Sequence, residues 1–213
     1  MGGPQAQSAS RAALAKRAPD VVAVWETLDD SPTGTEAARR EIRRRVAAGD
    51  APRLLAEQEA VADALAAALA EIPEEALRAA GGEEDWNVAQ AFAHTTAARR
   101  FLTAWAAMEA TGEWPDVDPP RATPGIPGPA DATRELLLTL LAKSRASMAR
   151  SAAQIAGHEL EDCRLEGSPI GRLRCGEWIL WVGVHDLMHL DQIERTVARL
   201  AAAGDGGPAA VGG

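Results

Sequence analysis

Two histidines, His185 and His189, stand four residues apart in an apolar stretch that no proline interrupts. In an α-helix this spacing places both imidazoles on one face, about 40° apart and one turn above the other. Two imidazoles in this arrangement can bind the same metal ion. The alternative is a pair of buried neutral histidines with local hydrogen bonds. Because the whole chain has only 4 histidines, the pair favours a metal site.

Elements that could position these histidines are visible as long segments with apolar residues at helical spacing. They lie near residues 53–72, 86–110, 131–156 and 176–203. Asn87 and Gln90 form a possible capping box at the start of the second segment. The pattern predicts an all-α fold, an up-down four-helix bundle with an additional helical N-terminal extension.

The connection of residues 111–130 holds six of the 13 prolines and cannot be helical. It is either an extended crossover or lid, or a plain linker between two antiparallel helices. We expect residues 1–50 to form the helical extension, with a disordered start over residues 1–10. Residues 51–203 are expected to form the bundle and residues 204–213 a disordered tail. Residues 160–174 are predicted to be a loop.

Composition narrows the class of protein. A length of 213 residues suits one domain with an appendage, and the scarcity of aromatic residues favours helices. The net charge of −9 argues against a nucleic-acid partner, so we interpret the arginines of a predicted helix at residues 35–48 as a solvated face. With 2 cysteines and no stretch apolar enough to span a bilayer, we expect a cytoplasmic protein without a membrane partner. Phosphate-binding loops, G-x-S-x-G and C-x-x-C motifs are absent from the sequence.

A third histidine, His94, lies on the inward face of segment 86–110, with small alanines beside it. Three neutral imidazoles from two helices would leave one coordination position open, as catalytic metal sites do. Gln192, one turn beyond the histidine pair, could hydrogen-bond the reacting nucleophile or be a buried amide. Trp178 and Trp181 are either pocket walls or core. Asp186 and Asp191 are expected at the surface or at an interface, with support of a metal ligand as an alternative role for Asp186. His158, which follows segment 131–156, is expected to be an exposed histidine at a helix end, with contact to the site as the alternative.

The motif Trp86-Asn-x-x-Gln-x-x-x-His94, followed by His185-x-x-x-His189-x-x-Gln192, resembles the DinB/YfiT-like superfamily. The run Pro169-Ile-Gly-Arg-Leu-Arg-Cys-Gly-Glu-Trp178 is similar to the lead-in to that family's last helix. The resemblance covers about residues 53–200 and implies a four-helix bundle with a three-histidine metal site. It makes His94, His185 and His189 the expected metal ligands.

The resemblance also implies a metal-dependent enzyme that acts on a small molecule. Some members transfer a low-molecular-weight thiol such as mycothiol or bacillithiol to an electrophile, and others are metal-dependent hydrolases. Both activities follow from one chemistry, because a metal lowers the pKa of the group at its open position. We expect a divalent ion, zinc or nickel, with iron and copper as alternatives, and a homodimer. The alternative from another class is a noncatalytic, stress-related helical binding module.

Overall fold

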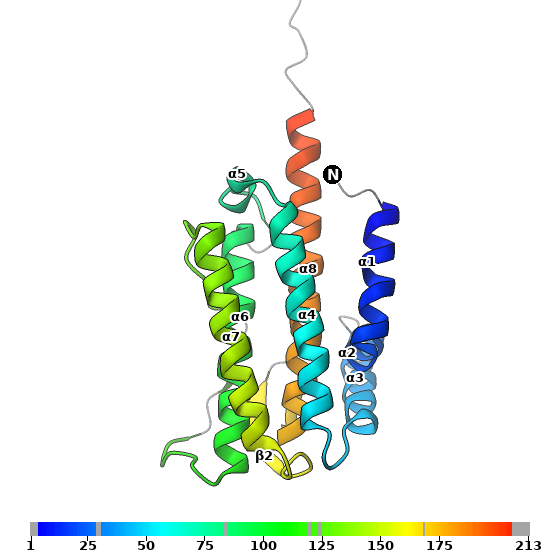
Figure 1. The fold of residues 1–213 in the computed structure, drawn as a ribbon, viewed down its shortest axis with the longest axis vertical. Helices are drawn as coiled ribbons and strands as arrows, with labels where there is room; N and C mark the ends of the chain where they lie inside the picture. The colour runs from blue at the N-terminus through cyan, green and yellow to red at the C-terminus, as the bar shows by residue number, and fades with distance from the viewer. Residues whose placement is uncertain are drawn as a thin grey trace, which may run out of the picture.

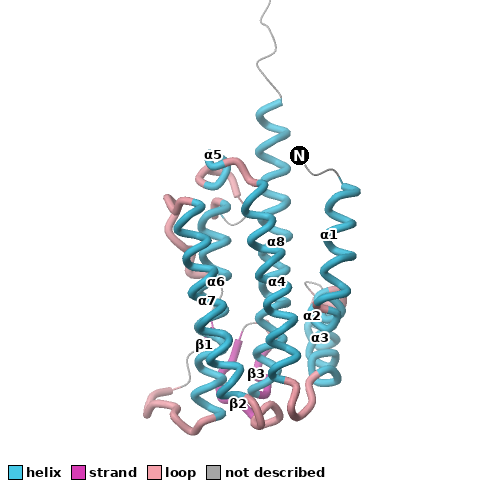
Figure 2. The backbone as a smooth tube through the Cα atoms, in the orientation of Figure 1, coloured by secondary structure: helices cyan, strands magenta, loops and turns pink. Residues whose placement is uncertain are grey.

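The computed structural model describes residues 4–28, 31–82, 85–118, 121–122, 125–167 and 169–205. Within these residues the chain forms a bundle of long helices that lie side by side (Figure 1 and Figure 2). The long helices are α4 (Ala51–Glu71), α6 (Val88–Ala110), α7 (Arg134–Ile155) and α8 (Cys175–Asp205). A short helix, α5 (Glu74–Leu77), follows α4. The mainly helical fold that the sequence predicted is confirmed.

The directions of the helices depart from strict up-down alternation at one step. Helices α4 and α8 run toward the upper end of the bundle in Figure 1, whereas α6 and α7 both run away from it. The described parts of the proline-rich connection, residues 111–118, 121–122 and 125–130, therefore belong to an extended crossover between two parallel neighbours. Proline suits this path because it fixes φ near −65° and has no N–H that would need a partner.

Helices α6 and α7 begin with local side-chain caps. The Asn87 side chain accepts a hydrogen bond from Gln90 N at 2.9 Å, and Gln90 Oε1 accepts one from Asn87 N at 3.1 Å. This is the predicted capping box. Thr133 caps α7 with a single bond, its side chain accepting from Leu136 N at 3.3 Å. The capping box fixes the first turn of α6, which begins at Val88, two residues after the start that the sequence predicted.

A small sheet lies at the lower end of the bundle, where the sequence predicted only a loop. Strand β2 (Asp162–Gly167) pairs antiparallel with β3 (Gly171–Arg174) and parallel with β1 (Arg121–Ala122) of the crossover. Burial alternates along β2, with Cys163 and Leu165 inward and their neighbours exposed. This period of two marks a strand packed on one face. The prediction of a loop over residues 160–174 is therefore wrong, because the alternation was overlooked beside its glycines and proline.

The N-terminal segment forms three helices: α1 (Pro4–Arg17), α2 (Pro19–Trp25) and α3 (Pro32–Arg45). Helix α1 begins inside the stretch expected to be disordered, because proline is favourable at the first helical position and no breaker follows until Pro19. The predicted tail over residues 204–213 lies outside the described residues from residue 206 onward.

This segment covers the outer face of α8. Buried Glu57 of α4 accepts hydrogen bonds from the first backbone N–H groups of α2, Asp20 N at 3.0 Å and Val21 N at 3.1 Å. A Cβ added at Gly183 of α8 would lie 2.8 Å from the Val21 side chain and 2.4 Å from Gln58 Nε2. The absence of a side chain at this glycine therefore allows α2, α4 and α8 to approach closely.

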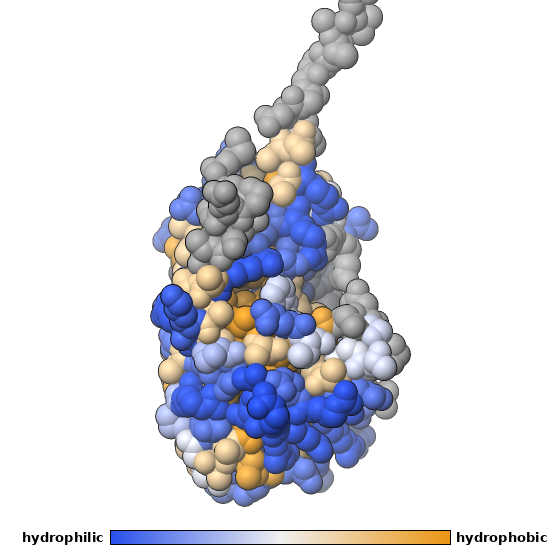
Figure 3. Space-filling model, turned by 90° about the vertical axis from the view of Figure 1, so that its right-hand side faces the viewer, coloured by the Kyte–Doolittle hydropathy of each residue, from blue (hydrophilic) through white to orange (hydrophobic). Residues whose placement is uncertain are grey.

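The arginines of α3 are used within the protein. Arg45 pairs with Asp20 at 2.5 Å and with Glu41 at 2.6 Å, and Arg39 donates to the carbonyl of Ile170 at 2.9 Å. The predicted solvated face is therefore only part of the picture, because Arg39 and Arg45 are partly buried in contacts within the protein. Figure 3 views the α1–α3 side, where hydrophilic side chains cover most of the surface and apolar ones gather near its middle. Across the described residues, none of the helices combines the length and apolar character needed to cross a bilayer.

Candidate metal centre

Three imidazoles meet between α6 and α8. His94 lies in the second turn of α6, and His185 and His189 lie one turn apart near the middle of α8. His185 Nε2 is 3.2 Å from His94 Nε2 and 3.2 Å from His189 Nε2. One ring nitrogen from each histidine lies within 4.8 Å of the other two. The packing of two helices thus brings together the side chains that the sequence singled out.

The remaining ring nitrogens indicate which tautomer each imidazole adopts. His94 Nδ1 is 3.0 Å from the carbonyl oxygen of Ile126, and His189 Nδ1 is 2.7 Å from Gln192 Oε1. Both oxygens only accept, so each Nδ1 donates its proton. In a neutral imidazole the other nitrogen then carries a lone pair. His94 and His189 therefore direct lone pairs toward His185 Nε2.

Burial keeps these two imidazoles neutral. Desolvation is the main cause that lowers the pKa of His94, followed by the nearby imidazole of His185. The same two causes, in the same order, lower the pKa of His189 to about 3. Neutral imidazole is the form that binds metal ions. The local environment thus favours the ligand form at neutral pH.

The donor set fits a divalent metal. Metal–nitrogen bonds of about 2.0–2.1 Å in a tetrahedral site separate the ligand nitrogens by about 3.3 Å, close to the observed 3.2 Å. His185 Nε2 carries at most one proton and can donate it to only one of its two neighbours, so hydrogen bonding alone leaves the lone pair of the other neighbour without a donor. A cation between the three nitrogens would satisfy all of them.

A buried ion pair lies behind the cluster. Arg99 of α6 and Asp186 of α8 are fully buried, with Arg99 Nη1 at 2.5 Å from Asp186 Oδ2. The other carboxylate oxygen lies 3.8 Å from His185 Nδ1, and neither of these two atoms has a hydrogen-bond partner. Placing Asp186 at the surface was therefore wrong, because α6 supplies a counter-charge inside the bundle.

Arg99 was missed by the sequence analysis. Arg99 and Arg100 are adjacent in one helix, yet the first is buried and the second exposed. Helical phase offered a weak signal, because position 99 continues the face of the buried residues Thr95, Thr96 and Leu102. Asp191 is more exposed than Asp186 and pairs with Arg11 at 2.7 Å.

Trp86 and the crossover form one side of the centre. The Trp86 ring is 5.1 Å from the ring of His94, centre to centre, and stacks on His189 at 6.3 Å with an interplanar angle of 11°. Gly125 packs on the Trp86 ring, since a Cβ there would lie 3.0 Å from Cζ2. The crossover thus contributes both the Ile126 carbonyl and a cover for the tryptophan beside the histidines.

The remaining candidate residues from the sequence lie in the core, just after α7 and beside His189. Trp178 and Trp181 are buried in the core, which agrees with the simpler of their two interpretations. His158 lies at the end of α7 and its Nδ1 is 2.7 Å from Glu161. Gln192 contacts the ring of His189, and its predicted catalytic role stays a prediction.

Fold and site together define a helical-bundle protein with a three-histidine cluster, the architecture of a metal-binding bundle. A model of the DinB superfamily matches residues 57–193, which include all three histidines. The chain therefore belongs to the DinB superfamily, and the resemblance inferred from its motifs is confirmed. A search of curated proteins gives no match.

Proposed function

We propose that this protein is a metal-dependent enzyme that transfers a low-molecular-weight thiol to an electrophilic small molecule. The proposal depends above all on the convergence of His94, His185 and His189, two of which are held neutral with their lone pairs directed inward. Zinc and nickel are the proposed ions, with iron and copper as alternatives, because imidazole ligands suit all four metals. Membership of the DinB superfamily and the three-histidine cluster are both compatible with a metal-dependent enzyme.

A divalent ion bound here would lower the pKa of a thiol or water molecule at its open position and so supply a nucleophile at neutral pH. The protein's own contribution is to orient the ligands. The Ile126 carbonyl and Gln192 hold two of the rings in the correct tautomer. Trp86 shields one side of the rings from water and offers an aromatic surface to a substrate.

Hydrolysis at the same centre is the second candidate. A hydrolase of this kind benefits from a carboxylate that moves protons during the reaction. Among the described residues, the carboxylate placed close to the imidazoles is Asp186, which is fully buried and paired with Arg99. A thiol needs only to lose its proton before it attacks, so this arrangement favours thiol transfer over hydrolysis.

The experiment starts from metal-free protein and measures zinc and nickel binding by calorimetry. Wild type should bind one ion, and His185→Ala should abolish both binding and turnover of the thiol with an electrophile. His158→Ala is the matched control, since this exposed histidine lies at the far end of α7 and should leave both unchanged. If wild type and His185→Ala bind metal equally, the proposal is wrong.

Cobalt-substituted protein separates thiol transfer from the other candidates. A thiol that binds the ion adds a sulfur-to-cobalt absorption band, which a hydrolase or a binding module would not require. Full metal loading without this band and without consumption of an electrophile would favour the noncatalytic module.

A small-molecule substrate, a cytoplasmic location and a homodimer belong to the same proposal. The N-terminal helices cover the outer face of α8, so the dimer depends on the family resemblance, and sedimentation tests it.

A further inference from the structure

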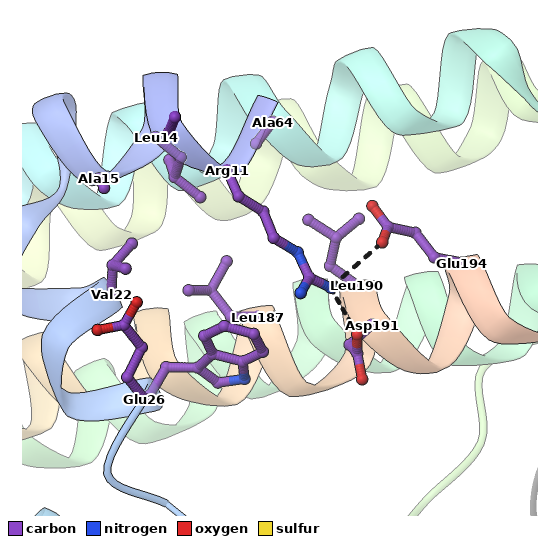
Figure 4. A pocket seen from close by; sticks show the side chains of 12 residues that line it. Arg11, Leu14, Ala15, Val22, Glu26, Ala64, Leu187, Leu190, Asp191 and Glu194 are labelled. Atoms are coloured by element: carbon purple, nitrogen blue, oxygen red, sulfur yellow. Dashed lines mark hydrogen bonds and ion pairs between the residues drawn. The ribbon is translucent and has the colours of Figure 1, made fainter. Parts of the chain in front are cut away.

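A pocket lies on the side of α8 that faces away from the histidine cluster. It is bounded by α1, α2, α4 and α8 and has a volume of about 250 Å³. Figure 4 shows Leu187 and Leu190 projecting from α8 toward α1, with Ala64 of α4 nearby. Ligand pockets are commonly about 300–1,000 Å³, so this one suits a small molecule of modest size.

The walls are mainly apolar, but the charged groups around them are unbalanced. Glu26, Asp191 and Glu194 line the pocket together with one cation, Arg11. The Arg11 guanidinium lies 2.7 Å from Asp191 and 3.5 Å from Glu194, at one end of the pocket (Figure 4). Glu26 lies toward the other end, beside Val22. The lining therefore carries a net negative charge once Arg11 is paired.

The position of Arg11 indicates that the pocket accommodates a cation. The guanidinium carbon of Arg11 lies 5.0 Å from the centre of the Trp25 ring, so a cation already rests against an aromatic face between carboxylates. Aromatic faces attract cations through their quadrupole. Burial is the main cause that raises the pKa of Glu194; the charge of Arg11 opposes this shift, and the charge of Asp191 adds to it. Three carboxylates against one guanidinium leave the lining with a net negative charge. This charge would repel an anionic ligand.

We propose that the pocket binds a small organic cation, a primary amine on an aromatic or aliphatic body. The body packs against Leu187, Leu190 and Trp25, and the ammonium group pairs with Glu26 at the end that Arg11 leaves free. Burial of the apolar body supplies most of the affinity, and the carboxylate supplies the preference for a cation. This site is separate from the metal centre and does not depend on it.

The test compares three probes with the same ring and different charges: phenethylamine, phenethyl alcohol and hydrocinnamate. Binding to the full chain is followed by NMR through the indole N–H of Trp25, which Trp25→Phe assigns. Phenethylamine should bind about threefold more tightly than the alcohol, the size of an exposed ion pair, and hydrocinnamate should bind more weakly than both. Glu26→Gln should remove the preference for the amine, whereas Glu113→Gln, an exposed control outside the lining, should keep it.

Filling the pocket provides a second readout. Ala15→Trp places an indole inside the pocket and should abolish binding, while Ala13→Trp, on the exposed side of the same helix, should not. Circular dichroism checks that both variants keep their helices, and Ala64→Phe fills the pocket from α4 if the first variant does not fold. Equal affinity for all three probes, a preference for hydrocinnamate, or unchanged binding in a folded filled variant would overturn the proposal. A Trp25 signal that changes with protein concentration alone would also overturn it, because a second copy would then occupy the site.

Discussion

Replacing Arg99 by methionine removes one half of an ion pair that is closed to solvent. The guanidinium contacts Asp186 at 2.5 Å, the Gln58 carbonyl at 3.3 Å and Met148 Sδ at 3.4 Å. Methionine retains much of the apolar length but leaves the Asp186 carboxylate buried without a counter-charge. Breaking a buried pair in this way costs about 3–5 kcal/mol. Since domains are stable by about 5–15 kcal/mol, Arg99→Met should lose a large share of the free energy of unfolding.

Urea unfolding of the metal-free protein, followed by circular dichroism, measures this loss. Arg145→Met is the matched control, because Arg145 pairs with Glu59 and Asp63 at the partly exposed surface and should cost no more than about 1 kcal/mol. The double variant Arg99→Met/Asp186→Leu should recover most of the stability, since it removes both buried charges. The reasoning is refuted if Arg99→Met unfolds at the same urea concentration as the control, or if the double variant is no more stable than Arg99→Met alone.

Three further variants test other parts of the structure. Gln192→Ala should weaken zinc binding by about tenfold or more in calorimetry, because the His189 ring loses its hydrogen-bond partner; unchanged affinity would contradict that role. The pKa of His189 is lowered to about 3, so the unfolded chain binds more protons there. Metal-free protein should therefore keep the full contribution of this group above about pH 6.5 and lose stability as the pH falls toward 3, and His189→Gln should show a smaller loss in urea titrations. Gly183→Ala should destabilise the protein by about 1–3 kcal/mol in the same assay, because its methyl group would overlap Gln58 and Val21; a neutral result would mean that α2 can move aside.

Much of the helical fold and the candidate site was predictable because the signals are local. The spacing of His185 and His189 places both on one face of any helix that contains them. The Asn87 and Gln90 capping box depends on residues three apart in the sequence, and the structure confirms it. The alternation along β2 is also local and could have predicted the strand.

Other features depend on contacts between distant segments. The parallel course of α6 and α7, the contact of the Ile126 carbonyl with His94, and the choice of Arg99 over Arg100 for burial all depend on how the helices pack. Periodicity shows which face of a helix is apolar, but it does not identify the partner across that face. The sequence alone therefore determined which residues could bind a metal. Only the tertiary structure decided that their nitrogens meet, because a 3.2 Å approach between two helices depends on the packing of every residue between them.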